Sequence, residues 1–295
     1  MIPPRTILAA VSFSDTSRVA LVLAARLARH CGAELHVLHA EDSLLHAAAN
    51  HAGIDLARET HDELQRFMAG AWPTAQCSPQ SHVIAGAAVD VILDVAGQYR
   101  ADLVVVGSCG MSSAERLVFG STTEALLRRA ELSVLVAPAE WMPPHPDALN
   151  LSGLGPLVAV VDPSDDSSGA AAKAACKLAS VLGTSVEIVH VVPALPVLSR
   201  WRAHADTAVR DRLAAQKERE LLIRGLECSA LVERRVEAGA MPNWLAEAAG
   251  LGSDRAPILV LGKKVHGSKG AAPYRVLSMA TVPILMHVAD PNAWA

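Results

Sequence analysis

Short apolar runs alternate with amphipathic segments along the whole chain. The runs are rich in Val, Leu and Ile, as is typical of strands buried on both faces of a parallel sheet. In the first half of the chain they cover residues 6–11, 34–39, 103–106 and 133–136. Helical periodicity marks the segments between them, including 17–31 and 87–96. This alternation predicts the α/β class with a doubly wound parallel sheet.

The same order of elements occurs twice. Gly32 and Gly183 each follow an expected helix and lie 151 positions apart, as do His39 and His190 in the following strands. The matching strands of the second half are expected at 157–161, 186–190, 258–261 and 283–286. Each half should thus contain four strands, three helices and one charged, more variable helix.

Two Rossmann-like domains account for this repeat. We expect domains at residues 1–138 and 157–289, a proline-rich linker at 139–156 and a tail at 290–295. Left alone, the last strand of each half would be an exposed apolar edge, which natural sheets avoid. We therefore expect residues 132–137 to pair antiparallel with 282–287, so that one chain forms a pseudo-dimer; a further homodimer remains compatible with this arrangement.

A glycine-containing loop follows the apolar run 103–106. Gly107, Gly110 and Gly120 have the spacing G-x2-G-x9-G and precede an expected helix. Glycines let backbone N–H groups approach phosphate oxygens, and the first turn of a helix supplies unpaired N–H groups with a partial positive charge. Hydroxyl donors follow at the helix start, namely Ser121, Thr122 and Thr123. The loop is neither a dinucleotide fingerprint nor a P-loop. The alternative is that these are ordinary turn glycines.

The pattern G-x2-G-x9-G-[ST] behind an apolar strand resembles the nucleotide loop of the universal stress protein family. The resemblance extends over both repeats and is strongest in the C-terminal part of the first. It implies that the first repeat binds an adenine nucleotide, ATP, with Mg²⁺ optional. The implied binding residues lie at the ends of three strands and in the loop: Ala10, Val11, Ser12, Ala40, Val106, Gly107, Cys109, Gly110, Gly120, Ser121, Thr122 and Thr123.

The two repeats depart from the family pattern in different ways. The family usually has an aspartate after the first strand that accepts from the adenine amino group; the first repeat has Ser12 and the second has Asp162. Conversely, the loop from Gly262 to Gly270 is five residues shorter than its counterpart in the first repeat, and Pro273 removes an N–H near the helix start. One carboxylate hydrogen bond contributes about 1.5–3 kcal/mol, whereas the loop supplies several charge-assisted bonds. We therefore expect a weakened nucleotide site in the first repeat and none in the second.

Composition narrows the classes of function. The chain has 295 residues, a formal net charge of −4 and only 3% aromatic residues, so nothing favours nucleic-acid binding. No apolar run reaches the roughly 18 residues of a membrane span, and the N-terminal residues do not resemble a secretory signal. Five cysteines without C-x-x-C spacing indicate reduced thiols and a cytoplasmic protein.

The remaining polar clusters are weaker signals. Cys109 could have an acidic thiol within the loop, but a passive role is favoured. His46 and His51 are five positions apart, which does not place two metal ligands on one helical face. The basic loop that begins at Lys263 could hold an anion, although a solvated loop is favoured. No nucleophile motif such as G-x-S-x-G supports a catalytic assignment.

Together these features predict a cytoplasmic, adenine-nucleotide-binding stress-response regulator that does not act as a fast enzyme, with a protein partner that the sequence does not identify. Two alternatives remain open. One is a nucleotide-free interaction scaffold. The other is a weak ATP-hydrolysing or nucleotidyl-transferring enzyme.

Overall fold

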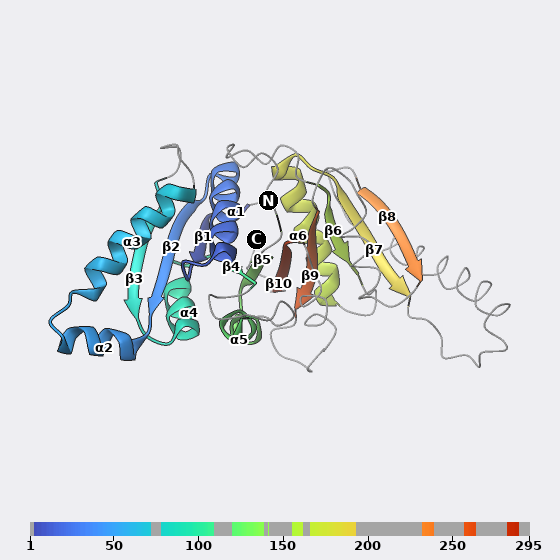
Figure 1. The fold of residues 1–295 in the computed structure, drawn as a ribbon. Coiled ribbons are helices and arrows are strands. Elements are labelled where there is room, and N and C mark those ends of the chain that lie inside the picture. Colours follow the sequence, from blue (N-terminus) through green and yellow to red (C-terminus); the bar gives the residue numbers. More distant parts are fainter. Residues whose placement is uncertain are drawn as a thin grey trace, which may run out of the picture.

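The ten strands in the described part of the chain belong to one continuous sheet with helices on both faces (Figure 1). The computed structural model describes residues 3–71, 78–108, 120–138, 141, 155–161, 166–192, 232–238, 257–263 and 282–288. The strands are β1 (Thr6–Ala10), β2 (Glu34–Glu41), β3 (Gln80–Ala85), β4 (Leu103–Gly107), β5 (Ser133–Ala137), β6 (Leu157–Val160), β7 (Val186–Val192), β8 (Val232–Ala238), β9 (Ile258–Lys263) and β10 (Ile284–Val288). The helices are α1 (Asp15–Cys31), α2 (Ser43–His51), α3 (Leu56–Ala71), α4 (Ala88–Gln98), α5 (Ser121–Arg129) and α6 (Asp166–Leu182).

The strand order confirms a pseudo-dimer of two doubly wound halves. The order is β3-β2-β1-β4-β5-β10-β9-β6-β7-β8, so the second half mirrors the first. Pairing is parallel within each half and antiparallel only between β5 and β10, where Leu135 lies opposite Leu285. This junction of β5 and β10, called the seam below, is the pairing expected from the two apolar final strands.

The expected number of strands was wrong by one in each half. The sequence predicted four, but the structure has five, because β3 and β8 had not been recognised as strands. Their sequences, QSHVIA and VERRVEA, carry many polar or charged residues, and they form the two outer edges of the sheet. Charge on an edge strand blocks pairing with other chains, and the charged residues of β8 hide its strand signal, as the polar residues Gln80, Ser81 and His82 do in β3. The variable segment of the first half also contains two helices, α2 and α3, instead of one.

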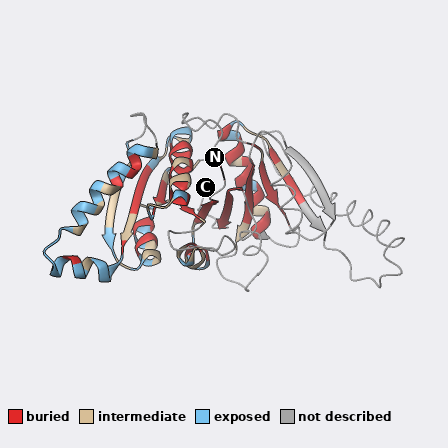
Figure 2. Ribbon diagram, viewed as in Figure 1, coloured by how far each residue is buried: buried red, intermediate tan, exposed pale blue. Residues whose placement is uncertain are grey.

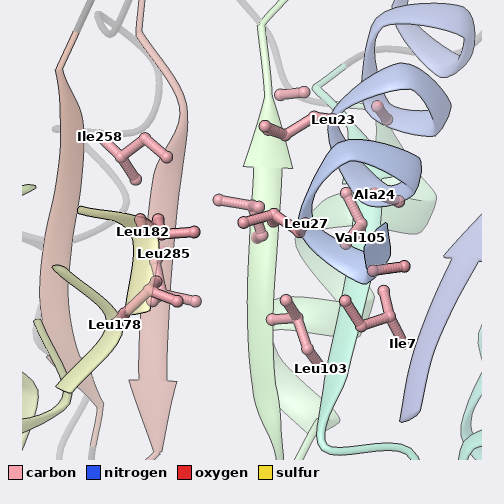
Figure 3. Close-up of a cluster of buried hydrophobic side chains, with 14 of the residues drawn as sticks. Ile7, Leu23, Ala24, Leu27, Leu103, Val105, Leu178, Leu182, Ile258 and Leu285 are labelled. Carbon is pink, nitrogen blue, oxygen red and sulfur yellow. The ribbon is translucent and has the colours of Figure 1, made fainter. Parts of the chain in front are cut away.

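Both faces of the sheet are buried, as Figure 2 shows for the central strands. Within β4, Leu103 and Val105 face a cluster formed with α1, α3 and α6, whereas Val104 and Val106 face a cluster formed with α4 and α5. The first cluster crosses the seam: Leu178 and Leu182 of α6 belong to the same cluster as Leu23 and Leu27 of α1 (Figure 3). The second cluster also contains residues of both halves, so the two halves share both apolar core layers.

The ends of α1 match the sequence signals for its start and stop. The Ser14 side chain accepts from the Ser17 backbone N–H, and Gly32 adopts a left-handed conformation with φ of 65° directly after the helix. Gly183 has φ of 66° after α6. The 151-residue offset of the two glycines is thus an offset between equivalent helix ends.

The domain boundaries remain predictions. Most of the expected linker 139–156 and all of the tail 290–295 lie outside the described residues, as does the expected helix 242–249. Among the described helices, none is long and apolar enough to cross a membrane.

Candidate functional site

The strands β1, β2 and β4 are parallel neighbours, so their carboxyl ends lie side by side at one end of the sheet. This line of strand ends is called the carboxyl edge below. Ala10 lies opposite Val106 in the register of β1 and β4. The Val11 N–H donates to the Leu38 carbonyl of β2 at 2.9 Å. Ala40 lies near the end of β2 and pairs with Ile84 of β3. Ligands of open α/β sheets bind in the crevice outside the carboxyl ends of the strands, at the point where the strand order reverses.

The helix α5 begins at this edge without a side-chain cap. Its N-cap residue is Gly120, with φ of −56° and no side-chain hydrogen bond to the first turn. The Gly120 N–H donates to the Ser108 carbonyl at 3.0 Å, and the Ser108 N–H donates to the Ala137 carbonyl at 2.8 Å. These bonds hold the two ends of the loop 109–119 together beside the end of β4. An uncapped helix start is a favourable place for an anion.

The predicted hydroxyl donors differ in their surroundings. Ser121 is exposed and Thr122 is half-buried, so both lie at the accessible start of α5. Thr123 is buried, and its hydroxyl donates to the Gly107 carbonyl at 2.8 Å. A hydroxyl has one proton to donate. Thr123 therefore anchors α5 to β4 instead of offering a donor to a ligand.

Gly107 has a packing role that the sequence did not reveal. A Cβ at this position would lie 2.7 Å from the Thr16 hydroxyl and 2.8 Å from the Thr16 backbone carbon. Gly262 of β9 is equivalent: its Cβ would lie 2.3 Å from the Ser167 carbonyl oxygen of α6. In both repeats the glycine lets the first turn of the long helix that follows the first strand, α1 or α6, approach the glycine-bearing strand. For Gly107, the structural alternative to a phosphate role thus has direct support.

Ser12 takes part in a serine network at the start of α1. Its Oγ lies 3.2 Å from Ser14 Oγ and 3.0 Å from Ser17 Oγ, and its N–H donates to Ser17 Oγ. Ser14 in turn caps α1. The Ser12 hydroxyl is therefore oriented by neighbouring hydroxyls before any ligand arrives.

Sequence reasoning missed three residues at this edge. His39 Nδ1 donates to the Val11 carbonyl at 2.9 Å, and its ring lies 4.3 Å from the Phe13 ring. Burial lowers the pKa of His39, while the Val11 carbonyl and the charge of Glu41 act in the opposite direction. Phe13 has a positive φ of 59°, which is rare for a bulky residue. The third residue, Glu41, is only 3% exposed. A glutamate directly after the strand pattern that ends at His39 and Ala40 was the signal that could have revealed it.

Lys263, the first residue of the predicted basic loop, contacts the other repeat. Its Nζ donates to the Ala130 carbonyl, the C-terminal cap of α5, at 2.6 Å. Burial lowers the pKa of Lys263, and the charge of Glu131 opposes this effect. Within the described residues this lysine therefore contacts a helix C-terminus, where a cation is favourable.

Several predicted residues lie outside the described part of the chain. These are Cys109 and Gly110 of the loop, and Asp162 of the second repeat. Burial raises the pKa of the Cys31 thiol to about 11, which makes that cysteine unreactive. Among the described residues, no three His, Cys, Asp or Glu side chains come together as a metal site.

Comparison with known proteins identifies the class. Over 97% of its length the chain superposes on a universal stress protein from Archaeoglobus fulgidus, with a TM-score of 0.63, 16% identity and 99% coverage of that protein. At this identity the likeness shows the fold alone, and it covers both halves. The chain is thus a tandem α/β protein with two Rossmann-like halves in one sheet.

The family is given by the sequence comparisons. Residues 4–138 match the model of the universal stress protein family, and the first repeat belongs to that family. A universal stress protein of Mycolicibacterium smegmatis is 28% identical over 200 residues, or 63% of this chain and 61% of that protein. One from Mycobacterium tuberculosis is 40% identical over 53 residues, 18% of this chain and 36% of that protein. The chain therefore spans less than two thirds of these relatives.

Proposed function

We propose that the first repeat binds an adenine nucleotide, ATP, and that the protein acts as a stress-response regulator through binding and not through catalysis. The nucleotide would lie along the carboxyl edge of β1, β2 and β4, with its phosphates at the start of α5 and Mg²⁺ optional. The observation that carries the proposal is the uncapped N-terminus at Gly120, beside the end of β4. Backbone N–H groups there supply charge-assisted bonds to phosphate oxygens.

The proposed ligand set is smaller than the set that the family resemblance implies. Backbone groups after β1, at Ala10, Val11 and Ser12, and Ala40 of β2 would line the base. The phosphates would be held at the start of α5 by Gly120, Ser121 and Thr122, together with Cys109 and Gly110 of the loop. Val106, Gly107 and Thr123 would act indirectly, by holding β4 against α1 and α5.

The substitution Gly120→Asp should weaken ATP binding without destabilising the fold. A carboxylate at the N-cap accepts from the first turn and should stabilise α5 by about 0.3 kcal/mol, since glycine is itself a tolerated N-cap residue. The same charge would repel phosphates, so ATP affinity should fall at least 100-fold in calorimetric titration. Gly97→Ala is the control, because a Cβ at Gly97 meets nothing within 4 Å. Unchanged ATP affinity in Gly120→Asp would refute a phosphate site at α5.

Two further measurements address the alternatives. Mass analysis of nucleotide extracted from the unheated protein tests the scaffold alternative, which predicts none. Phosphate release from ATP, or nucleotidyl transfer, at many turnovers per protein would favour an enzyme. The proposal expects bound adenine nucleotide and no such turnover.

A further inference from the structure

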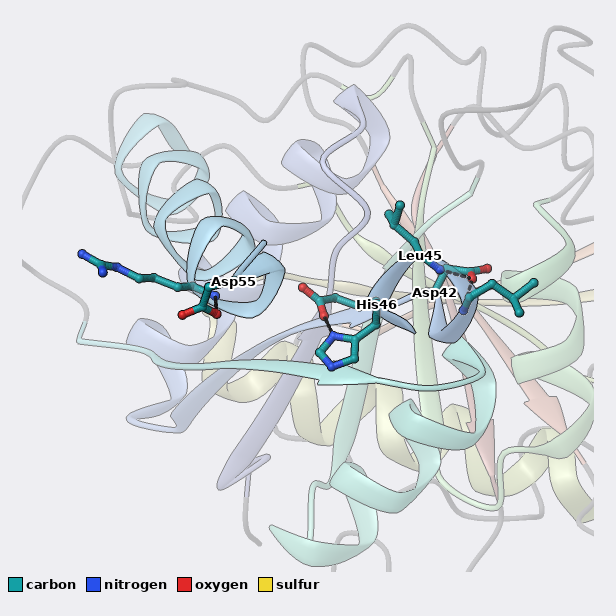
Figure 4. Close-up of polar contacts among 7 residues, drawn as sticks. Asp42, Leu45, His46 and Asp55 are labelled. Carbon is teal, nitrogen blue, oxygen red and sulfur yellow. Dashed lines mark hydrogen bonds and ion pairs between the residues drawn. The ribbon is translucent and has the colours of Figure 1, made fainter. Parts of the chain in front are cut away.

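Glu41 is a buried carboxylate with one oxygen left over. It is the last residue of β2 and is 3% exposed. Its Oε2 lies 2.8 Å from His46 Nδ1 of α2, the dashed contact at His46 in Figure 4. Its Oε1 is buried and has no hydrogen-bond partner among the described residues. Leaving a buried acceptor unsatisfied costs about 1–3 kcal/mol, more for a charged group, so such an oxygen calls for an explanation.

Glu41 lies at the carboxyl end of β2, where the base is proposed to bind. Glu41 directly follows Ala40, and its backbone carbonyl accepts from the Gly86 N–H at 2.9 Å, which ties the end of β2 to the end of β3. Two residues earlier, His39 ties the end of β2 to Val11 after β1. The end of β2 that carries Glu41 is thus hydrogen-bonded to the ends of both neighbouring strands, β1 and β3.

An aromatic surface lies on the same strand ends. The Phe13 ring is half-buried and lies 4.3 Å from the His39 ring and 5.6 Å from the Phe67 ring of α3. The positive φ of Phe13 is a strained conformation that the surrounding contacts must maintain. Glu41 lies two residues after His39 in β2, so the two side chains leave the strand on the same face. A flat ring together with a hydrogen-bond acceptor suits a heterocyclic base.

The residue expected to accept from the base is poorly placed for this task. The Ser12 hydroxyl already contacts the hydroxyls of Ser14 and Ser17. A base amino group would have to compete with this network, whereas Glu41 Oε1 has no described partner to displace. A carboxylate acceptor also forms a stronger bond than a hydroxyl.

We propose that Glu41 Oε1 accepts the exocyclic amino group of the base and makes the site selective for 6-aminopurines. This inference rests on the proposed nucleotide function. Because Oε2 is held by His46, one oxygen remains, and it matches the single amino group of adenine. Guanine presents two adjacent donors together with a carbonyl at position 6 and does not match a single acceptor. Inosine has a carbonyl where adenine has its amino group and leaves Oε1 unsatisfied.

The test compares ATP with inosine triphosphate by calorimetric titration. The wild-type protein should bind ATP at least tenfold more tightly than inosine triphosphate. Glu41→Met removes the acceptor and should abolish this preference by weakening ATP alone. Glu41→Gln keeps one acceptor oxygen and should retain part of the preference. Glu34→Gln, at an exposed glutamate that begins the same strand, is the matched control and should leave the preference unchanged. Ser12→Ala tests the alternative acceptor. Thermal unfolding of each variant verifies that it is folded, and Glu41→Gln carries the test if Glu41→Met does not fold.

The outcomes separate the two proposals. ATP binding with the same preference in wild type, Glu41→Met and Glu41→Gln would overturn the role of Glu41 and leave the nucleotide site intact. Loss of the preference in Ser12→Ala alone would assign base recognition to Ser12 instead. Absence of binding of either nucleotide to the wild type would overturn both proposals.

Discussion

The two repeats share their framework and differ at the site. Both have a 17-residue helix after the first strand, α1 or α6, and a left-handed glycine follows each helix. Both also have a glycine near the end of a central strand, Gly107 in β4 and Gly262 in β9, which the start of that helix approaches closely. Since Gly107 and Gly262 are both required by packing, their presence in two repeats says nothing about ligand binding. The framework glycines mark the fold.

The residue that follows each framework glycine shows how the repeats have diverged. In the first repeat it is Ser108, whose backbone closes the loop that leads to Gly120. In the second it is Lys263, whose side chain extends across to the C-terminal end of α5. In the first repeat α5 thus begins at Gly120 without a side-chain cap from that residue, while the second repeat contributes a cation to the other end of the same helix. Features found in only one repeat are therefore the better guide to function.

The largest effect should come from breaking the seam that joins the repeats. Leu135→Lys or Leu285→Lys places a charge where both leucines are at most 2% exposed, and should cost about 4 kcal/mol. Because both core layers cross the seam, both repeats should unfold together at lower temperature. Thermal unfolding with limited proteolysis in the linker measures this. Early melting of one repeat with the other unaffected would show that the repeats are independent.

Acid should weaken the seam through His287. This histidine of β10 is 4% exposed, and its Nδ1 lies 3.0 Å from the Ser133 hydroxyl of β5. Burial, with a smaller effect of Lys177, lowers the pKa of His287 from 6.5 to about 4. The unfolded chain therefore takes up the proton first, so stability is complete above pH 6.5 and falls as the pH decreases to 4.

The loss of free energy of unfolding should reach about 3 kcal/mol across this range. His287→Gln should remove that part of the pH dependence, as measured by urea unfolding between pH 7 and pH 4. The pKa values of His36, His39 and His82 are also lowered by burial, but these residues lie in β2 and β3 of the first repeat. The difference in pH dependence between the wild type and His287→Gln therefore reports the contribution of the seam histidine. An identical pH profile in the variant would exclude His287 as a contributor.

A methyl group at either framework glycine tests whether the repeats share the same packing. Gly107→Ala and Gly262→Ala should each cost about 2 kcal/mol, with the larger loss at Gly262, where the contact is closer and involves backbone. Gly97→Ala and Gly169→Ala are matched controls in α4 and α6, because neither Cβ meets an atom within 4 Å. Those two should be neutral or gain up to about 1 kcal/mol. Equal effects of all four substitutions would remove the close-approach argument.

The smallest effect is expected for the lysine that connects the repeats. Lys263→Met keeps the apolar stem and removes the bond to the Ala130 carbonyl, at a cost of about 1 kcal/mol. Hydrogen exchange should increase mainly in the last turn of α5, while Lys263→Arg should keep most of the protection. An increase spread evenly over both repeats would indicate a general loss of stability instead of a local contact.

Much of the fold could be predicted because its central strands are strongly apolar. The runs that became β1, β4, β5, β6, β9 and β10 were all recognised, as were the stops at Gly32 and Gly183. The edge strands β3 and β8 were missed, since their polar residues conceal the strand pattern. The start of α5 directly after Gly120 agrees with the sequence, whereas Gly110 lies outside the described residues and the roles of all these residues in ATP binding remain predictions.

The sequence by itself determined the α/β class, the tandem repeat and the pairing of the two final strands, because hydrophobic periodicity and repeated spacing are local properties of the chain. Only the tertiary structure decided what individual residues do. Gly107 proved to be a packing glycine because Thr16, distant in sequence, occupies the space of its Cβ. Thr123 directs its proton to Gly107, and Glu41 is buried with an unsatisfied oxygen. Such roles depend on contacts between distant segments, and spacing along the chain carries no record of them.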